Sequence, residues 1–466
     1  MFTLLASPVW ATTYFLAPAS GGGNDSNNGS SASAPWLTPN HPLNCGDVIL
    51  AAASTAYAQA NFTYGNWGTV TCAGGNNVAW LKCVTFDACK ISITSTDGMD
   101  IDRNYWGIQG WEVDGSSNAG ACFYAYPAAG VSIHHIVFAN DIANICGQGG
   151  FGASPNGSAG VDYVAFVGDI AYNAVGGPAY CSSAFNVYEP VASDSLPGTH
   201  YYLAGLFAWN NVDGNPCSGG TPTDGEGLFF DTTDGSQTGL PAYTMQMVMD
   251  NSISVFNGGR GVQSLENKAG ASQAPIYIRH ITSYGNMTDT SQTRYQCGEI
   301  YLSASFRTQV FLSITEPTAS KGCGDNPPYA YYVLNGDPTD LVYSNYGYSS
   351  SGNYSGTSGS GSFSFDPHNV FGTNPNFVNP VDPGAPNCSN STSVPNCMAT
   401  VIANFTPQAA SAAGYGYQVP STVQNYDPLF PQWLCNVNLL AGLVTMGCLS
   451  ASSLPAPVTI TNVTVQ

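Results

Sequence analysis

The sequence has few charged side chains: its 466 residues include 9 Lys and Arg against 29 Asp and Glu, which gives a formal net charge of −20. So few basic residues cannot form the cationic patch that a phosphate backbone requires, and nucleic acid is therefore excluded as a partner. An anionic membrane surface is disfavoured for the same reason. The sequence also lacks an uninterrupted run of about 18 apolar residues, so no membrane-spanning segment is expected.

Lys and Glu, the usual residues of exposed helices, are scarce, whereas Gly (53) and Tyr (27) are abundant. This composition excludes a helix-rich fold. A hydrophobic content of 43% with 12% aromatics supplies a core, so disorder is excluded for most of the chain. A surface made polar by uncharged amides and hydroxyls suits secretion into an acidic medium, because few charges are left to repel one another when carboxylates are protonated.

Fourteen cysteines are present, and none is arranged as paired CxxC zinc ligands. Disulfides are therefore expected, with Cys83 and Cys89 able to close a small loop and Cys45 with Cys72 a larger one; the full connectivity stays open. Residues 1–11 contain a short apolar stretch that ends in a small residue, which is typical of the end of a signal peptide. We therefore expect a secreted protein and exclude this remnant from the fold.

Short apolar strands with a small-aromatic-Asn signature recur between about residues 100 and 350. The copies are Ala171-Tyr172-Asn173, Ala208-Trp209-Asn210, Val255-Phe256-Asn257 and the looser Ser283-Tyr284-Gly285-Asn286. Repeats at irregular spacing are typical of a solenoid in which loops of varying length are inserted on one side of each coil. Asparagine suits the turns of such a fold, because its amide can bond to an asparagine one coil away. An array of β-sandwiches is the alternative.

A second set of strands can be aligned with the first, and alternation places Phe185, Leu228, Val262 and Ile300 in one inward-facing stack. Their neighbours then face outward and form a ladder of rings, amides and carboxylates, a surface on which a linear polysaccharide can lie. The ladder and the residue beside it give the candidate substrate-binding set: Asn186, Tyr188, Glu189, Phe229, Gln263 and Tyr301.

Three further motifs are present: an opening with a strand, a Gly/Ser-rich loop and Pro35-Trp36, a strand of Asp-Gly-x-Gly type that ends in Asp231, and an Asn-Gly-Gly-x-Gly strand from Asn257. These motifs resemble secreted right-handed parallel β-helix proteins of the pectate-lyase-like superfamily. The stretch from Phe365 also resembles the endings of these proteins, although Ala410-Ser411-Ala412-Ala413 lacks their proline and aspartate. The resemblance implies an all-β, single-chain right-handed parallel β-helix with caps at both ends.

The expected organisation has five parts. They are a signal-peptide remnant (1–11), an N-terminal cap with the first coils (12–100), the β-helix core (101–348), a Ser/Gly-rich loop with the C-terminal cap (349–416) and an apolar tail that packs on the solenoid (417–466).

Carboxylates gather at one point of the sequence, and three of them, Asp224, Asp231 and Asp234, are candidate calcium ligands. Calcium would also overcome an electrostatic repulsion. A protein of this charge repels an anionic polyuronate unless a divalent cation inverts the local charge. The alternative is that Asp224 and Asp234 are turn formers beside glycines. Glu226 and Arg260 occupy equivalent strand positions, so on adjacent coils they would lie about 5 Å apart.

The resemblance implies β-elimination from a uronide, in which Arg or Lys removes the proton beside a metal-neutralised carboxylate. Lys268 and Arg260 are the basic residues of this neighbourhood, and each can equally form a plain salt bridge. A calcium-assisted lyase acting on a polyuronate, with Lys268, Arg260 and Glu226 as catalytic candidates, is therefore the first hypothesis. A glycoside hydrolase with paired carboxylates is the second. A non-catalytic carbohydrate-binding surface protein is the third. We expect a monomer.

One further pattern is a pair of adjacent histidines. His134 and His135 are adjacent within a predicted strand, where neighbours face opposite sides, so the pair is not expected to chelate one metal.

Overall fold

The computed structural model describes residues 11–72, 77–116, 120–176, 181, 183–213, 224–266, 275–291, 297–318, 323, 328–419 and 427–437. Residues 1–10 of the expected signal-peptide remnant lie outside this set, as does Lys268. No helix in the described part of the chain is long and apolar enough to cross a membrane.

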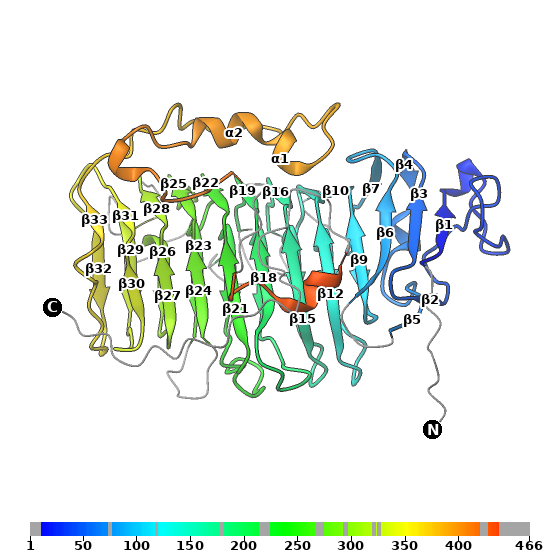
Figure 1. Cartoon of the computed structure of the whole chain (residues 1–466), viewed down its shortest axis with the longest axis horizontal. Coiled ribbons are helices and arrows are strands. Elements are labelled where there is room, and N and C mark those ends of the chain that lie inside the picture. Colours follow the sequence, from blue (N-terminus) through cyan, green and yellow to red (C-terminus); the bar gives the residue numbers. More distant parts are fainter. Residues whose placement is uncertain are drawn as a thin grey trace, which may run out of the picture.

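Three long sheets run side by side along the molecule (Figure 1), and the strands that pair within them are parallel. Sheet 1 contains β1 (Thr13–Leu16), β3 (Val48–Ala51), β6 (Ala79–Cys83), β9 (Trp106–Gln109), β12 (Ile133–Ala139), β15 (Val161–Val167), β18 (Thr199–Ala204), β21 (Gln246–Asp250), β24 (Ile276–Arg279), β27 (Thr308–Phe311) and β30 (Leu341–Tyr343).

Sheet 2 contains β4 (Ser54–Tyr57), β7 (Cys89–Ser92), β10 (Trp111–Asp114), β13 (Ile142–Asn144), β16 (Ile170–Tyr172), β19 (Phe207–Trp209), β22 (Ile253–Val255), β25 (Thr282–Tyr284), β28 (Ile314–Glu316), β31 (Tyr346–Gly347) and β33 (Val370–Phe371). Sheet 3 contains β8 (Met99–Ile101), β11 (Phe123–Ala125), β14 (Phe151–Ala153), β17 (Phe185–Tyr188), β20 (Leu228–Asp231), β23 (Val262–Leu265), β26 (Gly298–Ser303), β29 (Tyr329–Leu334) and β32 (Ser355–Ser358). A separate small pair joins β2 (Leu43–Asn44) to β5 (Val70–Thr71).

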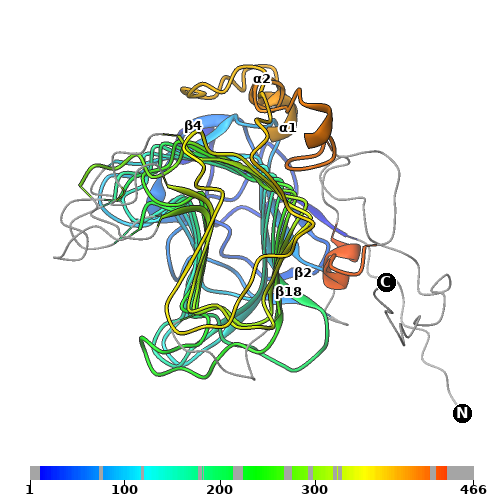
Figure 2. The same cartoon turned by 90° about the vertical axis from the view of Figure 1, so that its left-hand side faces the viewer.

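The chain visits sheets 1, 2 and 3 in turn and then returns to sheet 1 one step further along, as in β18, β19, β20 and β21. Seen along its length in Figure 2, the molecule is a stack of such coils around one interior. This is a parallel β-helix, the fold class that the sequence predicted. Among the described residues, helix is confined to short pieces: α1 (Val394–Cys397), α2 (Ala399–Asn404) and the 3₁₀ turns η1 (Ala19–Gly21), η2 (Gln59–Asn61), η3 (Ala410–Ala412) and η4 (Gln432–Asn436).

The predicted inward stack is confirmed residue by residue. Phe185 pairs with Leu228, Leu228 with Val262 and Val262 with Ile300, and each of these side chains is at most 1% exposed. Burial of each such side chain contributes about 1.5–3 kcal/mol before the entropy of ordering the chain is subtracted. Rows of this kind fix the register, because a slip by one residue would turn the row toward solvent.

The small-aromatic-Asn repeats pair as predicted in one step and are shifted in another. Tyr172 pairs with Trp209, but Trp209 pairs with Val255 and not with Phe256. The alignment that matched Phe256 to the aromatic residues is therefore wrong by one position. Phe256 has a positive φ of 54° and Asn210 one of 53°, so Phe256 takes the turn position that Asn210 has in the preceding coil.

That shift creates a buried asparagine ladder at the turn from sheet 2 to sheet 3. Asn211 Nδ2 donates to Asn257 Oδ1 at 2.8 Å, and Asn257 Nδ2 donates to Asn286 Oδ1 at 2.9 Å. Glu299 ends the row, since its Oε1 accepts from the Asn286 backbone N–H at 3.0 Å. The predicted bonding between asparagines of neighbouring coils is thus present, with Asn211 in place of Asn210.

Disulfides close loops along the solenoid. Both pairs suggested by the sequence are present, and the described bonds are Cys45–Cys72, Cys83–Cys89, Cys122–Cys146, Cys297–Cys323 and Cys388–Cys397. Cys181 and Cys435 are also disulfide-bonded.

The segment expected as the C-terminal cap lies mainly along the side of the solenoid. Phe377, Val394, Met398 and Phe405 pack on the outer face of sheet 2, and the Val394 backbone N–H donates to Asn140 Oδ1 at 3.1 Å. This part of the expected cap is therefore corrected to a cover that runs back over sheet 2, as α1 and α2 do in Figure 1. The apolar outer row of that sheet, which includes Ile170, Phe207 and Ile253, is what it buries.

The described part of the tail packs on sheet 1, as predicted. Phe430, Trp433, Leu434 and Val437 lie against an apolar outer row that includes Tyr202. Trp433 Nε1 donates to the Thr199 carbonyl at 3.2 Å. Arg279 pairs with Asp250 at 2.6 Å and also with Asp427, which ties the segment to β21 and β24.

Candidate functional site

Sheet 3 presents the remaining outer face of the coil, because the two C-terminal segments lie over sheets 1 and 2 (Figure 2). Strand register places Asn186, Phe229, Gln263 and Tyr301 in one row across β17, β20, β23 and β26. The sequence predicted this row, and the described candidate catalytic and metal-binding residues lie in the strands that form it or next to them.

The row is less open than the sequence suggested. Asn186 is half-buried, but Phe229, Gln263 and Tyr301 are 2%, 5% and 4% exposed. The Arg260 guanidinium lies 3.7 Å from the centre of the Tyr301 ring and Arg260 Nη1 donates to Gln263 Oε1. The expectation of an exposed aromatic and amide platform is therefore wrong for these three residues.

Glu226 and Arg260 are adjacent, as the alignment predicted. Arg260 Nη1 lies 3.4 Å from Glu226 Oε1, and Ser183 Oγ donates to Glu226 Oε2 at 3.2 Å. Glu226 is fully buried, and the Arg260 side chain is 11% exposed. Glu226 therefore holds the guanidinium in place and does not itself face solvent.

Asp231 is the last residue of β20, and its carboxyl has a strongly shifted pKa. Burial raises the pKa of its carboxyl to about 7, and the charges of Glu226 and Glu189 add to the rise. Opposing this, Thr232 Oγ1 donates to Asp231 Oδ1 at 2.8 Å, and the Asn186 side chain also bonds to the carboxyl. Asp231 is 8% exposed, and its carboxyl is still partly protonated near neutral pH.

Glu189 and Tyr188 serve the loop that follows β20. Glu189 is fully buried, and its Oε1 accepts from the backbone N–H groups of Gln237 and Thr238 at 2.8 and 3.0 Å. Tyr188 is half-buried and its hydroxyl donates to Gln237 Oε1 at 3.2 Å. Glu189 is thus engaged in anchoring residues 237–238, whereas Tyr188 keeps one edge toward solvent.

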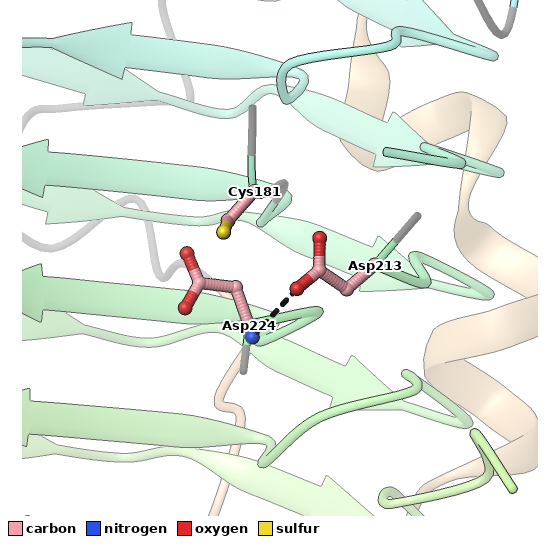
Figure 3. A group of neighbouring side chains, drawn as sticks. All are labelled: Cys181, Asp213 and Asp224. Carbon is pink, nitrogen blue, oxygen red and sulfur yellow. Dashed lines mark hydrogen bonds between the residues drawn. The ribbon is translucent and has the colours of Figure 1, made fainter. Parts of the chain in front are cut away.

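The three predicted calcium ligands are not brought together. In the part of the chain that the structure describes, one group of three metal-ligating side chains has its ligand atoms within 4.8 Å of one another, and it consists of Cys181, Asp213 and Asp224 (Figure 3). Asp231 and Asp234 do not belong to it. Cys181 is disulfide-bonded, so its sulfur is no thiolate ligand, and Asp213 Oδ2 accepts from the Asp224 backbone N–H at 2.9 Å. The group does not fit a metal.

Asp234 is 7% exposed, and its Oδ1 accepts from the Ser236 backbone N–H at 3.2 Å, as a turn former would. Lys268, the other candidate base, is outside the described residues. Of the predicted catalytic and metal set, the structure pairs Glu226 with Arg260, and the charge of Glu226 acts on Asp231.

The fold places the chain among the parallel β-helix proteins. No protein-family model matches the sequence, and no curated protein sequence does. Among solved structures, the chain is similar to pectate lyase Pel9A, with a TM-score of 0.41 and 17% identity over 91% of this chain and 96% of that one. A GH136 lacto-N-biosidase from Eubacterium ramulus matches with a TM-score of 0.39 and 9% identity over 78% and 68% of the two chains.

A mannuronic acid specific polysaccharide family 6 lyase from human gut microbiota matches with a TM-score of 0.29 and 13% identity over 77% of this chain and 78% of that one. At these identities the likeness concerns the β-helix alone.

Proposed function

We propose that the protein is a carbohydrate-active enzyme that binds a glycan along the outer face of sheet 3 and uses Asp231 as a general acid. The observation that supports the proposal is the state of Asp231, a carboxyl with a pKa of about 7 and 8% exposure on the face that the described C-terminal segments do not cover. The motif resemblance to pectate-lyase-like proteins supports a polysaccharide as the ligand.

Glycoside hydrolysis is the reaction class that this state favours. A carboxyl with a pKa of about 7 is partly protonated near neutral pH and can donate its proton to the leaving oxygen of a glycosidic bond. Asn186 bonds to the carboxyl and Thr232 donates to it, so the acid is held in one orientation. Glu226 and Glu189 are fully buried and so do not contact the glycan; their charges act by raising the pKa of Asp231. Asp231 is thus the general acid, and the role of base or nucleophile is left unassigned.

Calcium-assisted elimination from a polyuronate is the second candidate, and Arg260 favours it. Its guanidinium is fixed between Glu226, Gln263 and Tyr301, where it would neutralise a substrate carboxylate. The scattered positions of Asp224, Asp231 and Asp234 count against a calcium ion held by these three. Lys268 remains a proposed base.

A glycan panel of polygalacturonate, alginate and neutral polysaccharides separates the candidates. Hydrolysis gives new reducing ends without near-ultraviolet absorbance, survives chelators, and is lost in Asp231→Asn but kept in Lys268→Ala. Elimination gives unsaturated, absorbing products and fails with chelators or in Lys268→Ala. Asp382→Asn is the matched control, because Asp382 bonds Asn210, the residue that follows β19 of sheet 2. Binding without either product would leave a carbohydrate-binding protein and overturn the enzymatic proposal.

We further propose that the protein is secreted and monomeric. Its disulfides need an oxidising compartment to form. Amino-terminal sequencing of the exported protein should begin near residue 12, and light scattering should give the mass of one chain. A protein that stays inside the cells and still carries residues 1–11 would contradict secretion.

A further inference from the structure

Two histidines on sheet 1 point the same way, against the expectation from strand alternation. Along β12, Ile133 and Ile136 are both buried in the core, at 1% and 0% exposure, with two residues between them instead of one. His135 has a positive φ of 60°, which turns it to the side of His134. The two Nδ1 atoms consequently lie 2.8 Å apart.

The same irregularity recurs on the neighbouring coils and holds the pair in place. Tyr105 and Tyr163 also have positive φ, at 65° and 49°. The His135 ring stacks on Tyr163 with centroids 4.4 Å apart, and Trp433 meets its edge at 5.2 Å. A left-handed backbone costs a non-glycine residue about 1 kcal/mol or more, so these ring contacts and the strand pairing maintain it.

We propose that His134 and His135 form a bidentate binding site for a divalent transition metal ion, with copper(II) as the preferred ion. With metal–nitrogen bonds of about 2.0–2.1 Å, the 2.8 Å separation of the Nδ1 atoms corresponds to an angle of about 90° at the ion. That angle suits two neighbouring corners of a square-planar or tetragonal site, the geometry of copper(II) and nickel(II). Water would fill the open corners, because His134 is half-buried and reaches solvent.

Nearby charge supports metal binding. The carboxylates of Asp162 and Asp194 act on both rings and favour a nearby cation. In the free protein one Nδ1 donates to the other. On metal binding that ring would carry its proton on Nε2, so both rings offer a lone pair and no net proton is released.

The test is titration of the untagged full chain with copper(II) sulfate, followed by calorimetry and electron paramagnetic resonance. One ion per chain is expected, with hyperfine splitting from two nitrogens. His134→Ala should weaken binding by more than about 100-fold, since loss of an outer-shell partner of a ligand alone costs about 10–100-fold. His135→Gly should do the same without harming the fold, because glycine readily adopts positive φ.

His280→Ala is the matched control, because His280 is a half-buried histidine of the same sheet that faces Asp250, and it should bind copper like the parent. Unchanged binding in His134→Ala and His135→Gly, or no binding by the parent at micromolar copper, would overturn the proposal.

Discussion

The backbone N–H of Asp141 donates to Oδ1 of Asp169 at 2.8 Å, and the two carboxyls are fully buried on successive coils. Asp141 accepts from the backbone N–H groups of Trp111 and Ala139, whereas Asp169 Oδ2 has no partner. Further along the solenoid, the same kind of turn uses a neutral residue, as where Asn345 Oδ1 accepts from the Ser313 N–H at 3.0 Å. Burial raises the pKa of both aspartates well above the usual range, and the charge of Asp141 raises that of Asp169 further.

Asp169→Asn should stabilise the protein at neutral pH. A group whose folded pKa is raised contributes stability that is complete below its unfolded pKa and is lost as pH rises through the folded value. The parent should therefore lose stability from pH 4 to pH 8, and the variant should lose less. Removing a buried unsatisfied group is worth about 1–3 kcal/mol. Urea unfolding at pH 4.5 and 7.5 checks this, and a steeper decline in the variant would contradict it.

Asn257→Ala should cost several kcal/mol of unfolding free energy. The amide of Asn257 accepts from Asn211 and donates to Asn286, and its loss leaves buried donors and acceptors unpaired at about 1–3 kcal/mol each. Asn210→Gly is the control, since Asn210 bonds the exposed side chain of Asp382 and glycine readily adopts its positive φ of 53°, and it should change stability by less than about 0.5 kcal/mol. Equal thermal midpoints for the two variants would show that the ladder does not stabilise the coil.

Asp231→Asn should lower kcat by about 10²–10⁴-fold, the contribution of a general acid. In the parent, activity should fall as pH rises through about 7, where Asp231 loses its proton. The free energy of unfolding should also fall as pH rises through about 7, because the pKa of Asp231 is raised in the folded state. The variant should therefore be at least as stable as the parent at pH 8. Turnover and thermal midpoints between pH 5 and 9 test both statements. Parent-like activity in the variant would remove Asp231 from the mechanism.

Trp433→Ala should loosen the segment over sheet 1. The indole is 5% exposed and donates to the Thr199 carbonyl, and truncating a large buried aromatic residue costs about 3–5 kcal/mol. Faster limited proteolysis near residue 430, with the coil itself still resistant, is the expected result. Val419→Ala, at a residue 72% exposed, should be cut like the parent. Parent-like protection of Trp433→Ala would mean that other contacts hold the segment.

The sequence by itself determined the coil and part of the candidate site. A side-chain period of two is a local property of a strand, so alternation identified the row of Phe185, Leu228, Val262 and Ile300. Placing these strands on adjacent coils also brought Glu226 next to Arg260, as the structure has them. The short loop between Cys83 and Cys89 was likewise readable, because few residues separate its ends.

Only the tertiary structure decided the rest. The positive φ of His135 depends on rings and strands of neighbouring coils, so alternation alone placed it on the wrong side of the sheet. The pKa of Asp231 depends on burial at the end of β20, which a linear sequence does not specify. The path of residues 377–417 over sheet 2 depends on apolar outer rows gathered from many coils, since no single strand carries enough of that surface to predict its cover.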